Sequence, residues 1–344
     1  MEHYAGLDVS LELTSVCIVD AQGGIVCEAK VASEPDALTN FLCARELDIA
    51  RVGLEAGPLS QWLHAGLVGA GFETVLLETR HVKAALSAMT VKTDRRDARG
   101  IAQLLRLGWY RPVHAKSVGA QEVRALLTAR KLMQSKLLDV ESGIRGVLRG
   151  FGLKVGPISR GRFDARIREL VDGHVILDTV IGSMLGARAA LEIEFKRLHR
   201  ELLALVRADP VCRQLMSVPG VGAIVAITFK SGVDDPARFK HSRDVGPHFG
   251  LTPRKYQSGE LDVTGRITKV GDRMVRTALY EAASVMLTRT VRFSGLKAWG
   301  MAVARRRGTK KARVALARKL GVILHRMWVD GTTFRWSHEE TAIA

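Results

Sequence analysis

Three short runs rich in β-branched residues open the chain, and they restrict its possible folds more than any other feature. The runs are YAGLDV (4–9), SVCIVD (15–20) and GIVCEAK (24–30). The turn AQGG joins the last two runs and is typical of a hairpin. We therefore expect three antiparallel strands at the start of a sheet.

Helical and strand-like patterns alternate after this hairpin. Pro35 stands where the first residue of a helix would, and a helical pattern continues from it to about residue 46. The run RVGLEA then reads as a buried strand that ends at Glu55. The remaining expected elements are a helix at about 59–70, a strand at 73–78, and helices at about 80–88 and 94–107. The order βββαβαβαα predicts an α/β domain with a mixed sheet.

The charge balance narrows the class of partner. The 344 residues include 52 Lys and Arg against 35 Asp and Glu, for a net charge of +17. Such a surplus favours a polyanionic partner, and nucleic acid is the first candidate. The charge is unevenly spread, because residues 1–60 hold ten acids and three bases whereas residues 282–329 hold twelve bases and no acid.

Cysteine usage and hydropathy bear on location. The four cysteines form no CxxC pair, and the N-terminus does not look like a signal peptide. No run approaches the roughly eighteen apolar residues of a membrane span. We expect a reduced, cytoplasmic protein that is not associated with a membrane. A basic helix lying on anionic lipid is the weaker alternative for the C-terminal tail.

Residues 116–210 read as almost wholly helical. A heptad-like seam with steps of 4, 3, 4 and 3 is formed by Leu191, Phe195, Leu198, Leu202 and Leu205, and Arg188 interrupts its backward extension. This pattern suits a dimerising helical hairpin. It suits equally well a seam that packs inside its own chain.

Residues 211–344 are expected to form a mostly α-helical domain. SVPGVGAIVA (217–226) resembles a helix-hairpin-helix, in which Gly220 and Gly222 would let backbone N–H groups approach a phosphate. A tight turn between helices with the same glycines needs no DNA. Residues 248–272 read as a Gly/Ser/Thr-rich loop region before the last helices.

Two acids stand three positions apart in KTDRRDA (92–98). As an isolated pair they would cap a helix, with Asp94 as the N-cap and Asp97 at N3. Asp8 lies inside the first strand-like run and Glu55 ends the fourth, and a charge in such a place needs a partner. If these two strands are parallel neighbours, Asp8 and Glu55 lie side by side and a nearby helix can direct Asp94 and Asp97 at them.

Four gathered carboxylates repel one another unless cations lie between them, and their oxygens suit Mg²⁺ or Mn²⁺. Two such ions about 4 Å apart would ready an attacking oxygen and stabilise the leaving one at a phosphodiester. The cations that flank the acids would attract a phosphate backbone or form a solvated helix face. They are Lys92, Arg95, Arg96 and Arg99.

GLDVS, GLEAGP and KTDRRDARGIAQLL resemble the DEDD tetrad of the RuvC-like (RNase H-fold) domain in transposases of the insertion-sequence one-ten family. VPGVG, FGLTPRKYQSGE and GRITKVGD resemble the C-terminal domain of the same family. The resemblance covers nearly the whole chain. It implies a RuvC-like catalytic domain at 1–115, a coiled-coil oligomerisation region at 116–210 and a transposase domain at 211–344.

The resemblance also assigns residues. Asp8, Glu55, Asp94 and Asp97 match the four metal-binding acids, and Ser258 matches the serine nucleophile. One departure is EAGPLSQW, where many relatives have a Thr-Gly-(Thr/Ser)-Tyr-like run after the glutamate. It leaves any role of Ser60 in doubt.

The resemblance further implies a recombinase that cuts and rejoins double-stranded donor and target DNA under the guidance of a bridge RNA. It implies a homodimer that pairs into a homotetramer, in which the RuvC-like domain of one subunit completes the active site around the serine of another. Nothing in the composition indicates an RNA.

Without the resemblance, Ser258 reads as a turn residue before Gly259. With it, we expect metal-assisted attack on a phosphodiester and a phosphoserine intermediate. Four cations surround the serine in sequence and would neutralise the developing charge, namely Arg254, Lys255, Arg266 and Lys269. His241 and His248 are interpreted as structural.

The basic tail is expected to bind phosphates through Arg305, Arg306, Arg307, Lys310 and Lys311, with Arg313, Arg318 and Lys319 beyond them. Trp299, Trp328 and Trp336 are interpreted as core or interface residues before base-stacking ones. Two rival functions remain. One is a RuvC-like, metal-dependent junction nuclease that uses only the tetrad and water, and the other is a non-catalytic nucleic-acid-binding protein.

Overall fold

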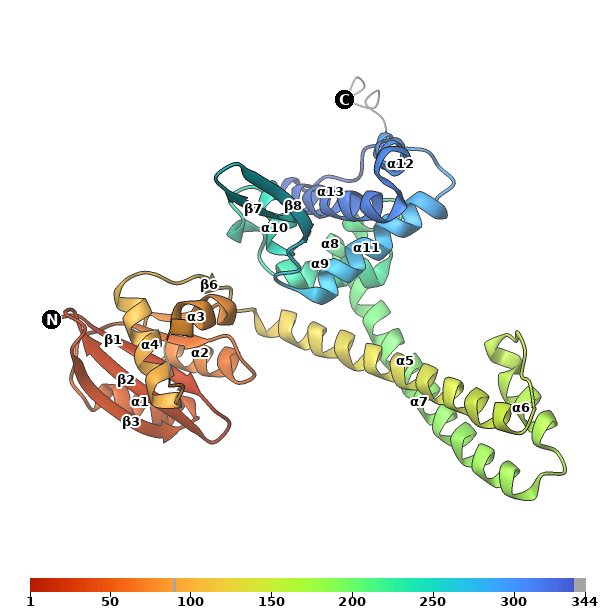
Figure 1. The fold of residues 1–344 in the computed structure, drawn as a ribbon, viewed down its shortest axis with the longest axis horizontal. Coiled ribbons are helices and arrows are strands. Elements are labelled where there is room, and N and C mark those ends of the chain that lie inside the picture. The colour runs from red at the N-terminus through yellow and green to blue at the C-terminus, as the bar shows by residue number, and fades with distance from the viewer. Residues whose placement is uncertain (89–90, 337–344) are drawn as a thin grey trace. The chain divides into compact units, whose positions relative to one another are not determined.

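The computed structural model describes residues 1–88 and 91–336 (Figure 1). The chain divides into two compact units, Met1–Lys116 and Ser117–Ala344. The further division of the second unit into an oligomerisation region and a C-terminal domain stays a prediction.

The first unit is built on a six-stranded mixed sheet with the order β3-β2-β1-β4-β5-β6. The strands are β1 (His3–Val9), β2 (Leu13–Asp20), β3 (Ile25–Ala32), β4 (Ile49–Glu55), β5 (Thr74–Leu77) and β6 (Pro112–Val113). Strands β1 to β3 are antiparallel, whereas β4 and β5 run parallel to β1. The expected mixed sheet and its three antiparallel opening strands are thus confirmed. The sequence pattern missed β6, which is only two residues long and begins with a proline.

Helices cover both faces of this sheet (Figure 1). They are α1 (Pro35–Cys43), α2 (Ser60–Gly69), α3 (Thr79–Ala85) and α4 (Asp94–Arg106). Pro35 begins α1 as expected, although the helix ends three residues before the predicted boundary. Successive strand residues point to opposite faces. Leu7 and Leu54 accordingly share a buried core with α1 and α2, while the alternate residues face α4.

Gly6 sets the distance between α4 and the sheet. A Cβ atom at this position would lie 2.2 Å from the carbonyl oxygen of Ala98 and 2.4 Å from the backbone nitrogen of Ala102. Only a glycine permits so close a backbone approach. The N-terminal turn of α4 is therefore held close to the C-terminal end of β1.

Long helices open the second unit. They are α5 (Val118–Gly150), α6 (Phe163–Val171) and α7 (Val175–Ala208), and α5 and α7 pack against each other (Figure 1). The predicted helical middle region is confirmed. Leu202 is buried in the core of its own chain, whereas 39% of Leu205 is exposed. The intrachain alternative thus accounts for part of the seam, and dimerisation stays a prediction.

Arg188, which interrupts the seam, is buried with 3% of its surface exposed. Its guanidinium forms ion pairs with Glu141 of α5 at 3.0 Å, Asp164 of α6 at 2.9 Å and Glu192 of α7 at 3.1 Å. A buried cation with three acidic partners ties the helices of this region together. The interruption is therefore a structural link between helices.

A helical bundle forms the rest of this unit, as expected. Its helices are α8 (Pro210–Leu215), α9 (Ala223–Val233), α10 (Val245–His248), α11 (Arg273–Thr288), α12 (Gly295–Arg307) and α13 (Thr309–Asp330). They surround a core that includes Phe229, Phe249 and Leu320. Among the described residues, none of the helices has the length and apolarity to cross a membrane.

The prediction of a loop region over 248–272 is wrong. Residues Pro253–Ser258 form β7, which pairs with β8 (Leu261–Ile267) as an antiparallel hairpin. Gly259, with a φ of +55°, stands in the turn. Every residue of the two strands except Ile267 is exposed, so the hairpin has no buried face for an apolar pattern to record.

Candidate metal centre

Asp8 and Glu55 lie next to each other at one end of the sheet. Strands β1 and β4 are parallel neighbours with Leu7 opposite Leu54, and each acid follows its leucine directly. Because the two leucines face α1 and α2, the two acids point to the opposite face, on which α4 lies. The condition for placing the two acids side by side, that their strands are parallel neighbours, is therefore met.

The first turn of α4 carries Asp94 and Asp97. Thr93 is the N-cap, and its hydroxyl accepts a hydrogen bond from the backbone N–H of Arg96 at 3.3 Å. The reading of Asp94 as the N-cap is therefore wrong, since Asp94 is the first residue of the helix itself. A threonine does the capping, so capping does not explain the two carboxylates.

The pKa values of the strand acids record how closely the four carboxylates gather. Burial, together with the charges of Asp97 and Asp94, raises the pKa of Asp8 to about 6. Burial and the charges of Asp8 and Asp97 likewise raise the pKa of Glu55, against a smaller opposing effect of Lys92. Acids from α4 thus destabilise the charged forms of the two strand acids.

A divalent cation would offset this repulsion. The donor atoms are all carboxylate oxygens, the ligands that Mg²⁺ and Mn²⁺ prefer, so the four acids fit such an ion chemically. Within residues 1–88 and 91–336, no three Asp, Glu, His or Cys side chains already stand close enough together to hold an ion. The structure thus brings the acids near one another, but not yet into the close arrangement that a bound ion requires.

A pocket of about 300 Å³ opens beside Asp8 and Glu55. Its wall includes Thr79 and the residues from Ala56 to Ser60, which lead from β4 into α2. The Ser60 hydroxyl donates to the carbonyl of Gly57 at 2.8 Å and accepts from its N–H at 3.0 Å. These hydrogen bonds show that Ser60 stabilises the turn between β4 and α2.

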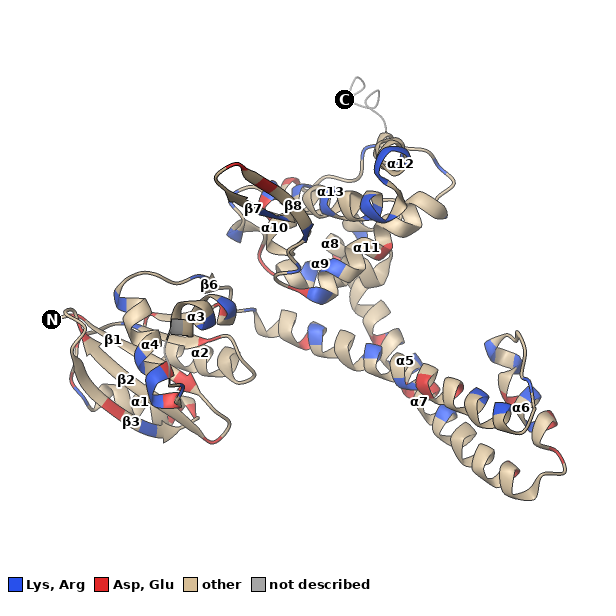
Figure 2. Cartoon of the chain, viewed as in Figure 1, with Lys and Arg blue, Asp and Glu red and all other residues tan. Residues whose placement is uncertain are grey.

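Basic side chains lie around the start of α4 (Figure 2). The Lys92 ammonium stands 3.7 Å from a carboxylate oxygen of Asp97. Arg95 forms an ion pair with Glu28 of β3. Arg96 donates from Nη1 to the carbonyl of Val91 at 3.3 Å. Their contacts with nucleic acid stay predictions.

Ser258 is exposed at the end of β7, opposite Leu261. Among the cations that surround it in sequence, Lys255 pairs with Asp262 across the hairpin at 3.1 Å, and Arg254 donates to the carbonyl of Thr268 at 3.4 Å. Arg266 on β8 is exposed, and Lys269 has a φ of +57° beyond the hairpin.

The two histidines near the hairpin in sequence have structural contacts, as expected. His241 caps the short helical turn Ser242–Asp244. The ring of His248 stands edge-on to Phe239 and Phe249. These contacts account for both histidines without a catalytic role.

The glycines of the expected helix-hairpin-helix differ from each other. Gly220 has a φ of +83°, and a Cβ there would lie 2.5 Å from the carbonyl oxygen of Ala282 in α11. Close packing within the bundle thus explains Gly220, which favours the tight-turn alternative. Gly222 faces open space and remains a candidate for phosphate contact.

The cations of the basic tail are exposed at the end of α12 and the start of α13, namely Arg305, Arg306, Arg307, Lys310 and Lys311 (Figure 2). Trp299 and Trp328 pack against the bundle core. The Lys319 ammonium lies 4.3 Å from the ring centre of Trp299, and the guanidinium of Arg292 lies 4.0 Å from that of Trp336. The packing of Trp299 and Trp328 favours the core interpretation of these two residues, and the interpretation of Trp336 stays a prediction.

The fold and the gathered acids define an α/β domain with a candidate metal centre of four carboxylates, and comparisons with known families point to DEDD transposases. A DEDD model described as "Transposase" matches residues 5–152. A second model, described as "Transposase IS116/IS110/IS902 family", matches residues 212–298. The two models together cover more than half of the chain in the family order, so the chain is similar to transposases of the IS116/IS110/IS902 family along most of its length.

Individual proteins show the same likeness. The transposase for insertion sequence element IS1111A of Coxiella burnetii is 28% identical over 337 residues, which are 96% of this chain and 90% of that protein. The transposase for insertion sequence element IS1328 of Yersinia enterocolitica is 31% identical over 142 residues, which are 41% of this chain and 42% of that protein. Among solved structures, Thermus thermophilus RuvC in complex with a Holliday junction substrate matches 33% of this chain and 100% of its own, with 14% identity and a TM-score of 0.26.

Proposed function

We propose that this protein is a transposase of the IS116/IS110/IS902 family, which cuts and rejoins double-stranded DNA by metal-assisted serine transesterification. One observation carries the catalytic part of the proposal. Burial, together with the nearby charges of Asp97 and Asp94, raises the pKa of Asp8 to about 6, and burial and the charges of Asp8 and Asp97 raise the pKa of Glu55. A protein that only binds nucleic acid has no use for such repulsion, and a metal-dependent enzyme does.

In this proposal Asp8, Glu55, Asp94 and Asp97 hold Mg²⁺ or Mn²⁺. The bound metal would polarise the scissile phosphate and stabilise the oxygen that leaves it. Lys92 and Arg96 attract the DNA backbone to the same end of the sheet. The wall formed by Ala56 to Ser60 limits the approach to the strand acids.

Ser258 supplies the nucleophile. Its hydroxyl loses a proton and forms an ester bond with phosphorus, while a deoxyribose oxygen leaves and takes up a proton. A DNA hydroxyl from the partner strand then attacks the phosphoserine and releases the serine. Arg254, Lys255, Arg266 and Lys269 would offset the charge on the phosphorane. Each exchange replaces one phosphoester with another, so the reaction needs no nucleotide hydrolysis.

We extend the proposal to the assembly. The tetrad and Ser258 belong to different compact units of the chain. In a homodimer that pairs into a homotetramer, one subunit's acids would serve the serine of another. Donor and target are chosen by a bridge RNA, and the basic tail with Gly222 holds phosphates of DNA or RNA.

The catalytic proposal is tested with the full-length protein, its element-end DNA and the flanking RNA. Asp8→Asn should lower Mg²⁺-dependent cleavage on the order of 10³-fold or more, because it removes a metal ligand. Asp48→Asn changes an exposed acid of the same unit and should leave cleavage unchanged. Equal activity of wild type and Asp8→Asn would eliminate the metal centre.

The serine is tested by trapping the covalent complex on a denaturing gel. Ser258→Ala should abolish the protein–DNA adduct, whereas Thr264→Ala on the neighbouring strand should retain it. Both residues are exposed, so neither change should unfold the protein.

A RuvC-like nuclease without serine chemistry is the second candidate. It is favoured by the arrangement of Ser258, which is exposed on a hairpin, while the four acids gather within a single unit. Under this alternative Ser258→Ala keeps cutting DNA and wild type forms no adduct.

A further inference from the structure

The row of side chains that contains Asp8 continues across the sheet onto β2 and β3. Asp8 stands opposite Ser15 on β2, and Ser15 stands opposite Lys30 on β3. Directly opposed residues point to the same face of a sheet. Because neighbouring strands are about 4.8 Å apart, Ser15 lies roughly 5 Å and Lys30 roughly 10 Å from Asp8 along this row.

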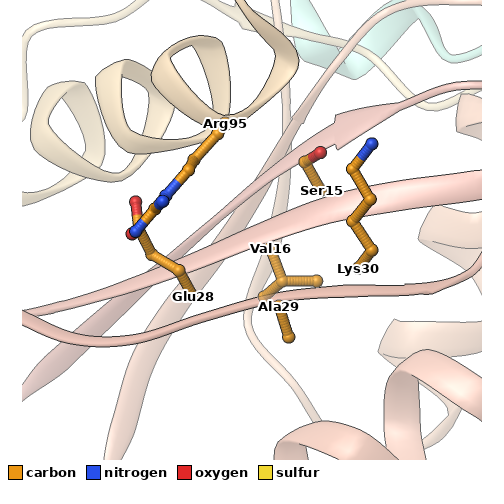
Figure 3. Close-up of a pocket in the computed structure, with 6 residues that line it drawn as sticks. All are labelled: Ser15, Val16, Glu28, Ala29, Lys30 and Arg95. Atoms are coloured by element: carbon orange, nitrogen blue, oxygen red, sulfur yellow. The ribbon is translucent and has the colours of Figure 1, made fainter.

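Ser15 and Lys30 line a second pocket, of about 270 Å³, which lies between these strands and the start of α4. In Figure 3 both side chains rise from the strands on the side from which Arg95 approaches. Val16, Glu28 and Ala29 complete the lining. The pocket is thus one strand removed from the candidate metal centre.

Ser15 offers a hydroxyl group in the wall of this pocket. Only 4% of this residue is exposed, and among the described residues its side chain has no hydrogen-bond partner. The neighbouring Thr14, by contrast, bonds to Ser33 at 2.8 Å. A hydroxyl in the wall of a pocket that forms no hydrogen bond within the protein can donate one to an oxygen atom that enters the pocket.

The charges of the pocket favour an anion. Arg95 is paired with Glu28, and this pair directs the guanidinium into the pocket without adding net charge. Lys30 is exposed and forms no ion pair within the described part of the chain. The net positive charge is notable because Lys30 is one of only three bases in residues 1–60.

We propose that this pocket binds a phosphodiester of the DNA strand whose scissile phosphate lies at the four acids. Lys30 supplies the charge, the Ser15 hydroxyl donates a hydrogen bond to a phosphate oxygen, and Arg95 closes the opposite side. The inference rests on the proposed function, since the row leads directly to Asp8. It makes Lys30 and Ser15 positioning residues that fix where the strand crosses the metal centre.

The test is fluorescence anisotropy of the full-length protein with a labelled DNA duplex in EDTA, at several salt concentrations. Lys30→Ala should reduce the slope of log K against log salt by about 0.9, the value for one lost phosphate contact. Ser15→Ala should weaken binding roughly fivefold, as expected for one neutral hydrogen bond, and leave the slope unchanged. Lys83→Ala removes an exposed lysine of the same unit outside the pocket and should change neither quantity.

An unchanged slope for Lys30→Ala, or an equal change for Lys83→Ala, would overturn the proposal. A slope change with a single-stranded RNA probe but not with DNA would overturn the assignment to DNA. Thermal melting with and without Mg²⁺ shows whether Lys30→Ala keeps the metal response of wild type. The binding assay contains no metal, so its result does not depend on catalysis. If the wild-type protein failed to cleave DNA, the catalytic proposal would be refuted, but the binding data would still test the phosphate pocket.

Discussion

The candidate metal centre and the Ser258 hairpin differ in how much of their geometry the fold determines. Asp8 and Glu55 stand on paired strands, and the contact between Gly6 and α4 brings Asp94 and Asp97 to them. The hairpin of β7 and β8 is exposed on both faces. An isolated two-stranded hairpin is at best marginally stable in water.

This contrast suggests how the proposed reaction is controlled. The acids are placed by the core of their own unit before any substrate arrives. The serine stands on a hairpin that contacts within its own chain stabilise only weakly. Binding of DNA or of another subunit would therefore order the hairpin. Cutting would then await assembly, which protects a cell's DNA from a single unpaired subunit.

The largest expected effect comes from Gly6→Ala. The added Cβ would meet backbone atoms of Ala98 and Ala102, so α4 must move away from β1. We expect the free energy of unfolding to fall by about 1–3 kcal/mol and Mg²⁺-dependent cleavage to be lost. Urea denaturation and the cleavage assay measure the two effects.

Gly69→Ala is the matched control for this change. A Cβ at Gly69 meets no atom within 4 Å, so stability and cleavage should be kept. If Gly6→Ala behaves like Gly69→Ala, the close contact does not position the acids and the contrast drawn above fails.

A smaller effect concerns pH. Protons compete with Mg²⁺ for Asp8, whose pKa is raised to about 6 by burial and by its acidic neighbours. Affinity for Mg²⁺ should fall about tenfold between pH 7 and pH 5, as Asp8 takes up its proton. Isothermal titration at several pH values measures this. If the affinity for Mg²⁺ did not change between pH 7 and pH 5, the carboxylates would not be close together in solution.

Removing the charge of Asp8 should stabilise the metal-free protein slightly. A raised pKa means that the charged acid destabilises the folded state at pH values above 6, and that this destabilisation disappears as the pH falls toward the unfolded value. Asp8 is only half-buried, so we discount the effect and expect Asp8→Asn to gain less than about 1 kcal/mol at pH 8. Thermal melting in EDTA tests the sign, and a lower melting temperature would contradict it.

The smallest expected effect lies in the hairpin. Val263 on β8 is 49% exposed, and Val263→Thr should change the free energy of unfolding by less than about 0.5 kcal/mol. Urea denaturation measures this change. A loss of more than about 1 kcal/mol would show that the hairpin is packed in the free protein, so that both regions are equally determined by the fold.

Local pattern predicted much of the first unit. The β-branched runs, the AQGG turn and Pro35 at a helix start each depend on neighbours in sequence, and the structure has the corresponding elements. Asp8 and Glu55 were found because a charge in a buried strand is conspicuous. Ser15 and Lys30 were missed, since nothing in their local sequence shows that β2 and β3 extend the row of Asp8.

The second unit shows where pattern is insufficient. The exposed hairpin lacks the buried face that produces an alternating apolar pattern, so its Gly, Ser and Thr residues suggested a loop. Gly220 suggested a phosphate contact. In the structure, however, a glycine is needed there because a side chain would collide with the backbone of Ala282. The requirement comes from a helix about sixty residues away in sequence, which no local pattern contains.

The sequence by itself indicated the order of strands and helices along the first unit, the four candidate acids and the basic end of the chain, because propensity and charge are properties of short segments. Only the tertiary structure decided that Gly6 admits α4, that Asp8 shares a row with Ser15 and Lys30, and that Ser258 stands on an exposed hairpin. Those features depend on which distant backbones approach one another, and packing alone sets that.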